Sequence, residues 1–532
     1  IYYKIVPMKR SIVLIFLALS FFPEAFSQIT TARRDAGRYG FRPKLLRGPY
    51  LQVATTNSII VRWRTDELDV SFVRFGTDRS KLDQLAGNNY RTREHIVTLT
   101  GLKPQTKYYY QIEGFKDTIQ GDVNNHFTTL PLAGKEDKIR IGIFGDCGTG
   151  IENQSKARDQ FEKYLGNDLL NSWILLGDNA YSWGTDNEYQ LKFFEPYKQN
   201  LLKKSPLFPA PGNHDYRDEP YASEIAQRSG EIDYYKIFSV PTKGESGGLP
   251  SHTLAYYSYD IGNVHFLSLD SHGSEEFGLR LFDTTGTQVK WVKQDLEANK
   301  NKGWIVVYWH HPPYSMGSHN SDTESQMRKI RENFLVILER YGVDLILCGH
   351  SHSYERSKLM QGHYGLEASF SPEKHLLSNS SGYYDGSVNS CPYVKDETGR
   401  GTVYVVSGSA GRVDHGQASF PHDALPFADT AIGGASILEI EGNRLDLKWI
   451  CADGKIRDRF TMMKNVNKKT VIKIKKGQTA SLKASWVGEY SWKGVNAKTQ
   501  SVDVKPTATV STYIVSDPYS CIQDVFEVHV SK

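Results

Sequence analysis

The sequence has few cysteines, almost no net charge and no long hydrophobic run, and each shortage argues against a class of protein. Five cysteines in 532 residues, at positions 147, 348, 391, 451 and 521, exclude a dense disulfide framework and leave open one disulfide among the last three. The 64 basic and 60 acidic side chains give a net charge of +4, so we expect no nucleic-acid partner. With 39% hydrophobic and 12% aromatic residues, the chain can form packed cores in three or four domains.

The apolar segment near the start of the chain is short. From Met8, two basic residues precede the apolar residues 11–22 and then the small residues Ala25 and Ser27, a pattern typical of a secretory signal cleaved before Gln28. We expect residues 1–27 to be a signal peptide, with 1–7 as read-through, and the protein to be secreted to the periplasm, cell surface or extracellular space. A retained anchor is the alternative, but the run is shorter than the roughly 20 residues that span a bilayer, so we expect no transmembrane helix in the mature chain.

The two ends of the remaining chain show the two-residue alternation of β-strands. Within residues 44–130 the alternating segments are 58–64, 70–75, 95–100 and 108–113, which predict an N-terminal β-sandwich. Residues 468–532 alternate in the same way and predict a small C-terminal β-sandwich. We expect the lysines at 468, 469, 473, 475 and 476 to form a solvated strand face. Contact with a cell surface or a polysaccharide is the alternative.

The central region has a different pattern. Short apolar runs alternate with helical segments between residues 137 and 463, and the apolar runs are 138–144, 173–176, 304–309 and 343–348. Residues 327–341 carry apolar side chains at helical spacing and end at Gly342, which predicts an amphipathic helix. A multi-domain protein with a central α/β catalytic domain and a mixed sheet follows.

Five loops of the central region place polar side chains directly after apolar runs. They are Gly145-Asp146-Cys147-Gly148, Gly177-Asp178-Asn179-Ala180-Tyr181, Gly212-Asn213-His214-Asp215, Val307-Tyr308-Trp309-His310 and Gly349-His350-Ser351-His352. Open α/β sheets form their sites at the carboxyl ends of strands, and glycine lets the backbone turn sharply there. Each loop alone would be an ordinary turn. The five together favour one functional site.

The seven candidate ligands in these loops supply oxygen and imidazole but no thiolate. They are Asp146, Asp178, Tyr181, Asn213, His310, His350 and His352. This set suits catalytic first-row metals rather than structural zinc. Seven ligands are too many for one tetrahedral ion with an open position, so we expect two ions about 3.5–4 Å apart that share a carboxylate and clamp the oxygens of a displacement at phosphorus. We expect Cys147 and Cys348 to be buried fillers.

In this order, the five loops resemble the signature of the purple acid phosphatases within the calcineurin-like metallophosphoesterase superfamily. The likeness covers about residues 47–463 and includes GHSHSYER at 349–356 and GTVYVVSG at 401–408. Its specific part is Gly-Asp-x-x-Tyr, because most metallophosphoesterases lack that tyrosine. The resemblance implies a four-layer catalytic domain behind a fibronectin-III-like domain. The terminal region resembles immunoglobulin-like modules of secreted bacterial proteins.

The resemblance also implies a role for each candidate ligand. A trivalent iron, Fe(3+), would bind Asp146, Tyr181, His352 and the bridging Asp178, and the Tyr181 phenolate would give a charge-transfer colour. A second, divalent ion, Fe, Zn or Mn, would bind Asp178 together with Asn213, His310 and His350.

Two further histidines are candidates for protonating the leaving group. His214 follows Asn213, and His319 lies where the family carries a substrate-contacting histidine; a surface loop histidine is the alternative for His319. Asn320 stands where plant-type members have another histidine. We expect His311 and Asp215 to orient ligands and Arg356 to support its loop from behind.

The predicted function is a secreted dinuclear acid phosphatase that hydrolyses small-molecule phosphomonoesters by direct attack of metal-bound hydroxide. A ferric ion is expected to extend this activity to acidic pH. One alternative keeps the site and changes the substrate to phosphodiesters or nucleotide pyrophosphates. Another is a non-catalytic surface adhesion protein, which the complete set of seven ligands argues against. The segment 360–398 follows the last metal loop and is expected to shape the pocket.

Overall fold

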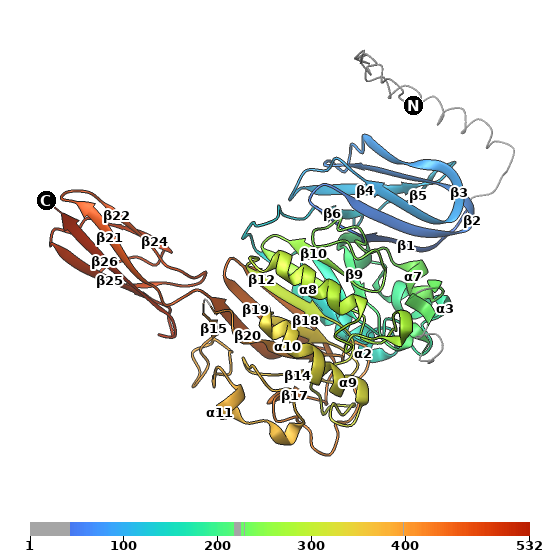
Figure 1. The fold of residues 1–532 in the computed structure, drawn as a ribbon. Helices are drawn as coiled ribbons and strands as arrows, with labels where there is room; N and C mark the ends of the chain where they lie inside the picture. Colours follow the sequence, from blue (N-terminus) through green and yellow to red (C-terminus); the bar gives the residue numbers. More distant parts are fainter. Residues whose placement is uncertain (1–42, 218–224, 228, 397, 532) are drawn as a thin grey trace, which may run out of the picture.

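The computed structural model describes residues 43–217, 225–227, 229–396 and 398–531 (Figure 1), and the expected signal peptide lies outside these residues. An N-terminal β domain packs on the central domain, and the C-terminal module extends away from it beyond β15 and β20. None of the helices in the described part of the chain combines the length and apolar character of a bilayer-spanning segment.

The strands of the N-terminal domain form one continuous hydrogen-bonded network. They are β1 (Leu45–Gln52), β2 (Ile59–Gly76), β3 (Gln84–Leu99), β4 (Lys107–Glu113), β5 (Thr118–Gln120) and β6 (His126–Thr128). The segments 58–64 and 70–75, expected as two strands, are one strand, because β2 continues through a bulge after Arg64. Glu67 and Leu68 are exposed at this bulge, so the alternation stops there although the strand does not.

The central domain contains two seven-stranded sheets. The first has the order β10 (Tyr257–Ile261), β11 (Val264–Ser268), β12 (Trp304–Tyr308), β13 (Leu345–Cys348), β16 (Val403–Ser407), β14 (Tyr354–Arg356) and β17 (Phe427–Asp429). The second has the order β15 (Tyr393–Lys395), β20 (Ile456–Lys464), β19 (Arg444–Cys451), β18 (Gly434–Glu441), β7 (Ile139–Phe144), β8 (Ser172–Leu176) and β9 (Leu207–Ala210). Both sheets mix parallel and antiparallel pairs, as the sequence predicts.

Alternate residues of the strands enter different cores, which gives four layers. In β12, Val306 packs between the two sheets and Val307 packs against helices, so the strand is buried on both faces. The main helices are α2 (Glu152–Leu165), α8 (Thr287–Asn299) and the continuous run α9 (Ser325–Lys329), η5 (Ile330–Phe334) and α10 (Leu335–Arg340). The last run confirms the helix predicted at 327–341, with a π-helical turn in its middle.

Shorter helices fill the connections of the central domain. They are α3 (Asp186–Glu188), η2 (Tyr189–Phe194), α4 (Glu195–Tyr197), α5 (Leu201–Lys204), η3 (His214–Tyr216), α7 (Asp233–Ile237), η4 (Glu276–Gly278), η6 (Glu367–Ser369) and α11 (Pro372–His375).

The N-terminal domain is held to the central domain by buried and partly buried polar contacts. Arg47 and Arg64 both reach Asp186, with Arg64 Nη2 donating to Asp186 Oδ1 at 2.8 Å. The hydroxyl of Tyr50 donates to the carbonyl of Ile237 at 2.9 Å. The two domains also share one hydrophobic core, so they are packed as a unit.

The C-terminal module has a separate core. Its strands are β21 (Lys469–Lys475), β22 (Ala480–Lys483), β23 (Ser491–Lys493), β24 (Ser501–Val504), β25 (Val510–Ser516) and β26 (Gln523–Ser531). They form a four-stranded and a two-stranded sheet around the buried Trp486 and Phe526. The side chains of β21 alternate between exposed and half-buried, with Lys469, Lys473 and Lys475 exposed, as expected for a solvated face.

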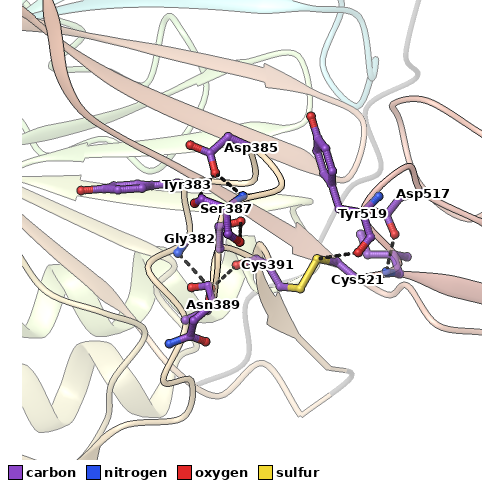
Figure 2. The surroundings of a disulfide bond; sticks show 12 residues. Gly382, Tyr383, Asp385, Ser387, Asn389, Cys391, Asp517, Tyr519 and Cys521 are labelled. Atoms are coloured by element: carbon purple, nitrogen blue, oxygen red, sulfur yellow. Dashed lines mark hydrogen bonds between the residues drawn. A yellow bond between two sulfur atoms is a disulfide. The ribbon is translucent and has the colours of Figure 1, made fainter.

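One disulfide joins this module to the central domain. Cys391, in the segment 360–398, bonds to Cys521, 130 residues later (Figure 2). This is one of the pairings that the sequence left open. Cys451 is free and buried, and Cys147 and Cys348 are buried as expected.

Candidate metal centre

Three of the predicted ligands lie at residues with unusual backbone conformations. Asp146, Asp178 and His350 have φ angles of 55°, 52° and 67°, which non-glycine residues rarely adopt. Each is separated by a single glycine from the end of a strand that has a parallel neighbour, β7, β8 or β13. Backbone strain of this kind concentrates at functional sites. The sharp turns direct all three side chains to the same edge of the two sheets.

Glycines bring the loops close enough to meet. A Cβ atom on Gly177 would lie 2.5 Å from His310 Nδ1, and one on Gly212 would lie 2.2 Å from Asp178 Oδ1. Both contacts are shorter than any side chain tolerates, so only glycine allows neighbouring ligand loops to pack at these points. This is the role that the sequence predicts for glycine before the ligands.

The first group of donor atoms contains Tyr181, Asp146 and His352, which we call the tyrosine side. The Tyr181 hydroxyl lies 2.9 Å from Asp146 Oδ1 and 3.0 Å from His352 Nε2. His352 Nε2 lies 3.6 Å from Asp146 Oδ1. Three potential ligand atoms from three separate loops therefore form one small triangle.

The second group contains His310, Asn213 and His350, which we call the histidine side. His310 Nε2 lies 2.9 Å from Asn213 Oδ1 and 3.2 Å from His350 Nδ1. It also lies 3.3 Å from Asp178 Oδ2. Asp178, His310 and His350 are all buried and close enough to share an ion. Asp178 also bonds to the Tyr181 hydroxyl of the tyrosine side. The structure thus brings all seven predicted side chains together, in two groups with Asp178 between them.

The electrostatics of the two groups favour bound cations. Burial, together with the neighbouring Asp178 carboxylate, raises the pKa of Asp146 well above its usual range. Burial opposes charge on His310, but Asp178 and Asp146 outweigh it and raise the pKa of His310 to about 9. Buried carboxylates this close need positive charge between them. The oxygen and nitrogen donors fit first-row metal ions.

The two candidate proton donors lie at the rim of these groups. His319 Nδ1 lies 2.8 Å from Glu324 Oε1, and the His319 ring stacks on His350 with 3.7 Å between ring centroids. His214 Nδ1 lies 2.6 Å from the carbonyl of Ser182, and its Nε2 lies 3.8 Å from Asp178 Oδ2. Both rings are partly exposed to solvent.

Two carboxylates that contact the predicted residues were missed at the level of sequence. Glu324 accepts from His319 and lies 3.4 Å from His350 Nε2. Asp414 Oδ2 lies 2.6 Å from His352 Nδ1. A signal for Asp414 was present, because its loop follows the apolar strand β16, which is parallel to β13 and must end at the same edge of the sheet.

The three residues expected to orient ligands or support a loop are all buried, but they contact different parts of the site. Asp215 is buried and accepts hydrogen bonds from the backbone of Gly212 and Asn179, and burial next to Asp178 raises its pKa to about 7. His311 is buried with Nδ1 2.9 Å from Ser271 Oγ, and its ring contacts that of His350. Arg356 is fully buried and bound to Asp458, which places it behind the loop and out of reach of a substrate.

The segment 360–398 supports the loop between His310 and His319. The hydroxyl of Tyr314 donates to the carbonyl of His363, and the two rings stack with 5.6 Å between centroids. Tyr364 anchors the segment further by donating to Glu339 at 2.6 Å.

Comparisons with known proteins agree with this architecture. The family profile described as calcineurin-like phosphoesterase matches residues 139–354, and that described as purple acid phosphatase, N-terminal domain, matches residues 47–129. Purple acid phosphatase 23 of Arabidopsis thaliana is 30% identical over 49% of this chain and 57% of its own length. Acid phosphatase type 7 of Mus musculus is 28% identical over 60% of this chain and 64% of its own length. The chain thus spans about three fifths of the length of these relatives.

Solved structures show the same fold. Purple acid phosphatase PPD1 from yellow lupin (Lupinus luteus) seeds superposes with a TM-score of 0.58 at 18% identity, covering 80% of this chain and 74% of its own. PhoD superposes with a TM-score of 0.51 at 12% identity, covering 78% and 90%. With both domain profiles, these relatives and the Gly-Asp-x-x-Tyr loop in place, the chain belongs to the purple acid phosphatase family of calcineurin-like phosphoesterases.

Proposed function

We propose that this protein is an acid phosphatase that hydrolyses phosphomonoesters at a centre of two metal ions. The observation that supports this proposal most is the gathering of seven donor side chains into two groups with the Asp178 carboxylate between them. Two groups that share one carboxylate match the expected arrangement for two-ion hydrolysis at phosphorus.

The two groups differ in charge, and this difference supports different ions. Asp146 and Tyr181 can both become anionic, so the tyrosine side would hold Fe(3+). Asn213, His310 and His350 are neutral ligands, so the histidine side would hold a divalent ion, Fe, Zn or Mn. When bound, such a pair supplies positive charge to the phosphate ester and makes water more acidic.

The chain's own residues would orient the ester and protonate its leaving oxygen. Glu324 accepts a hydrogen bond from His319 Nδ1 at 2.8 Å, which fixes the ring and leaves Nε2 to donate a proton to the leaving oxygen. The carbonyl of Ser182 holds His214 in the same way through Nδ1. The two rings would thus provide two routes for a proton to the leaving group.

Elemental analysis with a visible spectrum of the purified protein tests the metal centre. We expect two metals per chain, one of them iron, and a broad charge-transfer band that disappears in Tyr181→Phe. The matched control is Tyr90→Phe, which changes an exposed tyrosine of the N-terminal domain. A protein with both metals but no change of band in Tyr181→Phe would contradict the assignment of Tyr181.

Substrate class and pH dependence test the activity. Aryl and alkyl phosphomonoesters should be hydrolysed faster than the corresponding diesters or nucleotide pyrophosphates at the same metal content. A ferric ion should keep the rate high below about pH 6, so a rate that falls there with both metals retained would contradict the proposed iron. Faster hydrolysis of diesters would favour the alternative substrate class.

We also propose that the protein is secreted. The disulfide between Cys391 and Cys521 supports this, because such bonds persist in oxidising compartments. Fractionation of the source cells should place the enzyme in the periplasm, on the surface or in the medium, with an N-terminus near Gln28. Recovery from the cytoplasm with both cysteines reduced would contradict it.

A further inference from the structure

The histidines of the two groups are oriented by different acceptors. His310 Nδ1 lies 2.8 Å from the backbone carbonyl of Leu176, which is a neutral acceptor. His352 Nδ1 lies 2.6 Å from Asp414 Oδ2, which is a carboxylate. In both rings the bond holds the proton on Nδ1 and leaves the lone pair of Nε2 pointing to the other donor atoms. Of these two bonds, only the one to His352 also adds a negative charge, although on the histidine side the Glu324 carboxylate lies 3.4 Å from His350 Nε2.

The loop that carries Asp414 is attached closely to His352. The backbone N–H of Asp414 donates to the carbonyl of His352 at 3.1 Å, so the main chain and side chain of Asp414 hold the same residue. Gln417 and the N–H of His352 both bond to Ser318, at 2.8 and 2.9 Å. These bonds keep the carboxylate at a fixed place beside the ring.

Asp414 is in turn bound by Arg412. Arg412 Nη2 lies 2.5 Å from Asp414 Oδ1, and the side chains of Arg412 and Asp414 are 47% and 31% exposed. The carboxylate therefore contacts the imidazole through one oxygen and a guanidinium through the other. Removal of the Asp414 charge and removal of the Arg412 charge change the electrostatic potential at His352 in opposite directions.

We infer that Asp414 and Arg412 together set the charge on the tyrosine side of the centre, with Asp414 favouring the more highly charged ion there and Arg412 moderating its effect. The inference rests on the proposed function. Asp414 is a positioning residue in this account, because it acts through His352. A carboxylate behind a histidine makes the ring a stronger ligand, and added negative charge stabilises Fe(3+) relative to Fe(2+).

The test is the reduction potential of the iron, followed through the visible band in the full chain. Asp414→Asn keeps a hydrogen-bond acceptor and removes the charge, so the potential should rise and iron should be lost to a chelator about 10–100 times faster. Arg412→Gln should lower the potential. Asp414→Glu, which restores the charge, should return the potential toward that of the unaltered protein.

The matched control is the pair Asp453 and Arg457. It is another partly exposed aspartate–arginine pair, with 2.9 Å between the groups, and Asp453 lines the same surface hollow as Arg412 and Asp414. Asp453→Asn and Arg457→Gln should leave the potential unchanged.

Shifts in the same direction for Asp414→Asn and Arg412→Gln, or no shift in either, would overturn the inference and leave the proposed phosphatase intact. Absence of iron and of the band from the unaltered protein would overturn both.

Discussion

The tyrosine side and the histidine side of the candidate centre are built from the same kind of loop but differ in charge and exposure. His310 on the histidine side is fully buried and held by a backbone carbonyl. His352 on the tyrosine side is held by a partly exposed carboxylate that an arginine also binds. The difference teaches that the backbone of the fold fixes His310, whereas charged side chains near solvent adjust His352.

The largest effect is expected where the two sides meet. Asp178→Asn removes the shared charge, so both ions should bind weakly and kcat/KM should fall by more than the roughly 100-fold that follows loss of an orienting partner. Metal content and phosphomonoester hydrolysis measure this. Asp168→Asn, at an exposed carboxylate paired with Arg140, is the control and should change neither. Retention of both metals in Asp178→Asn would show that the sides are independent.

A change at the rim should separate proton donation from metal binding. His319→Ala should slow hydrolysis of alkyl phosphates about 100-fold or more, because their leaving oxygen needs a proton. Nitrophenyl phosphate, whose leaving group needs none, should be much less affected, and both metals should remain. His529→Ala, at an exposed histidine of the C-terminal module, should leave both rates unchanged. Equal losses for the two substrates would remove His319 from this role.

A matched pair of substitutions, one on each side of the candidate centre, tests most directly whether the two sides bind their ions separately. Asn213→Ala should weaken the divalent ion about 10–100-fold and keep the colour. Tyr181→Phe should abolish the colour and weaken the iron while the divalent ion stays. Metal analysis after dialysis, with spectra, distinguishes the two. Loss of both metals in both variants would mean that the sides cannot be treated separately.

The smallest effect on the centre is expected from the disulfide. Replacing Cys391 and Cys521 by serine should reduce the stability of the docked C-terminal module by about 2–4 kcal/mol. Calorimetry and limited proteolysis measure this change. Because the module has its own core, kcat/KM and the visible band should be unchanged. A shift of the visible band would show that loss of the disulfide affects the centre through the segment 360–398, which contacts Tyr314 in the loop between His310 and His319.

Local sequence patterns were sufficient to predict the parts of the fold in which all residues of one kind, apolar or polar, lie in the same kind of environment. Apolar runs such as 304–309 are strands buried on both faces, and polar residues directly after them lie at one edge of the sheets. Local patterns failed where pairing between strands decides the secondary structure. The exposed residues within β2 look like a turn, but pairing with β3 on either side of the bulge carries the strand through them.

The residues of the candidate site also fall into those that local sequence patterns indicate and those that only tertiary contacts reveal. The seven candidate ligands, whose side chains the structure brings together, could be selected from the sequence because each follows a strand and has a recognisable chemistry. Glu324 and Asp414 were missed, since an acidic residue in a loop has many possible partners, and the position of the Asp414 loop after an apolar strand indicated only the edge of the sheet and not the partner. Asp414 is 62 residues from His352 in the chain, and only the parallel pairing of β13 and β16 brings their loops together.

The order of residues alone determined the donor atoms, the glycines that let them approach, and the strands that end in them, because these depend on near neighbours in the chain. The tertiary structure decided which cysteines pair, which carboxylate lies behind which histidine, and how charge is divided between the two sides. Those outcomes depend on distances between segments far apart in the sequence, and such distances exist only once both sheets have packed.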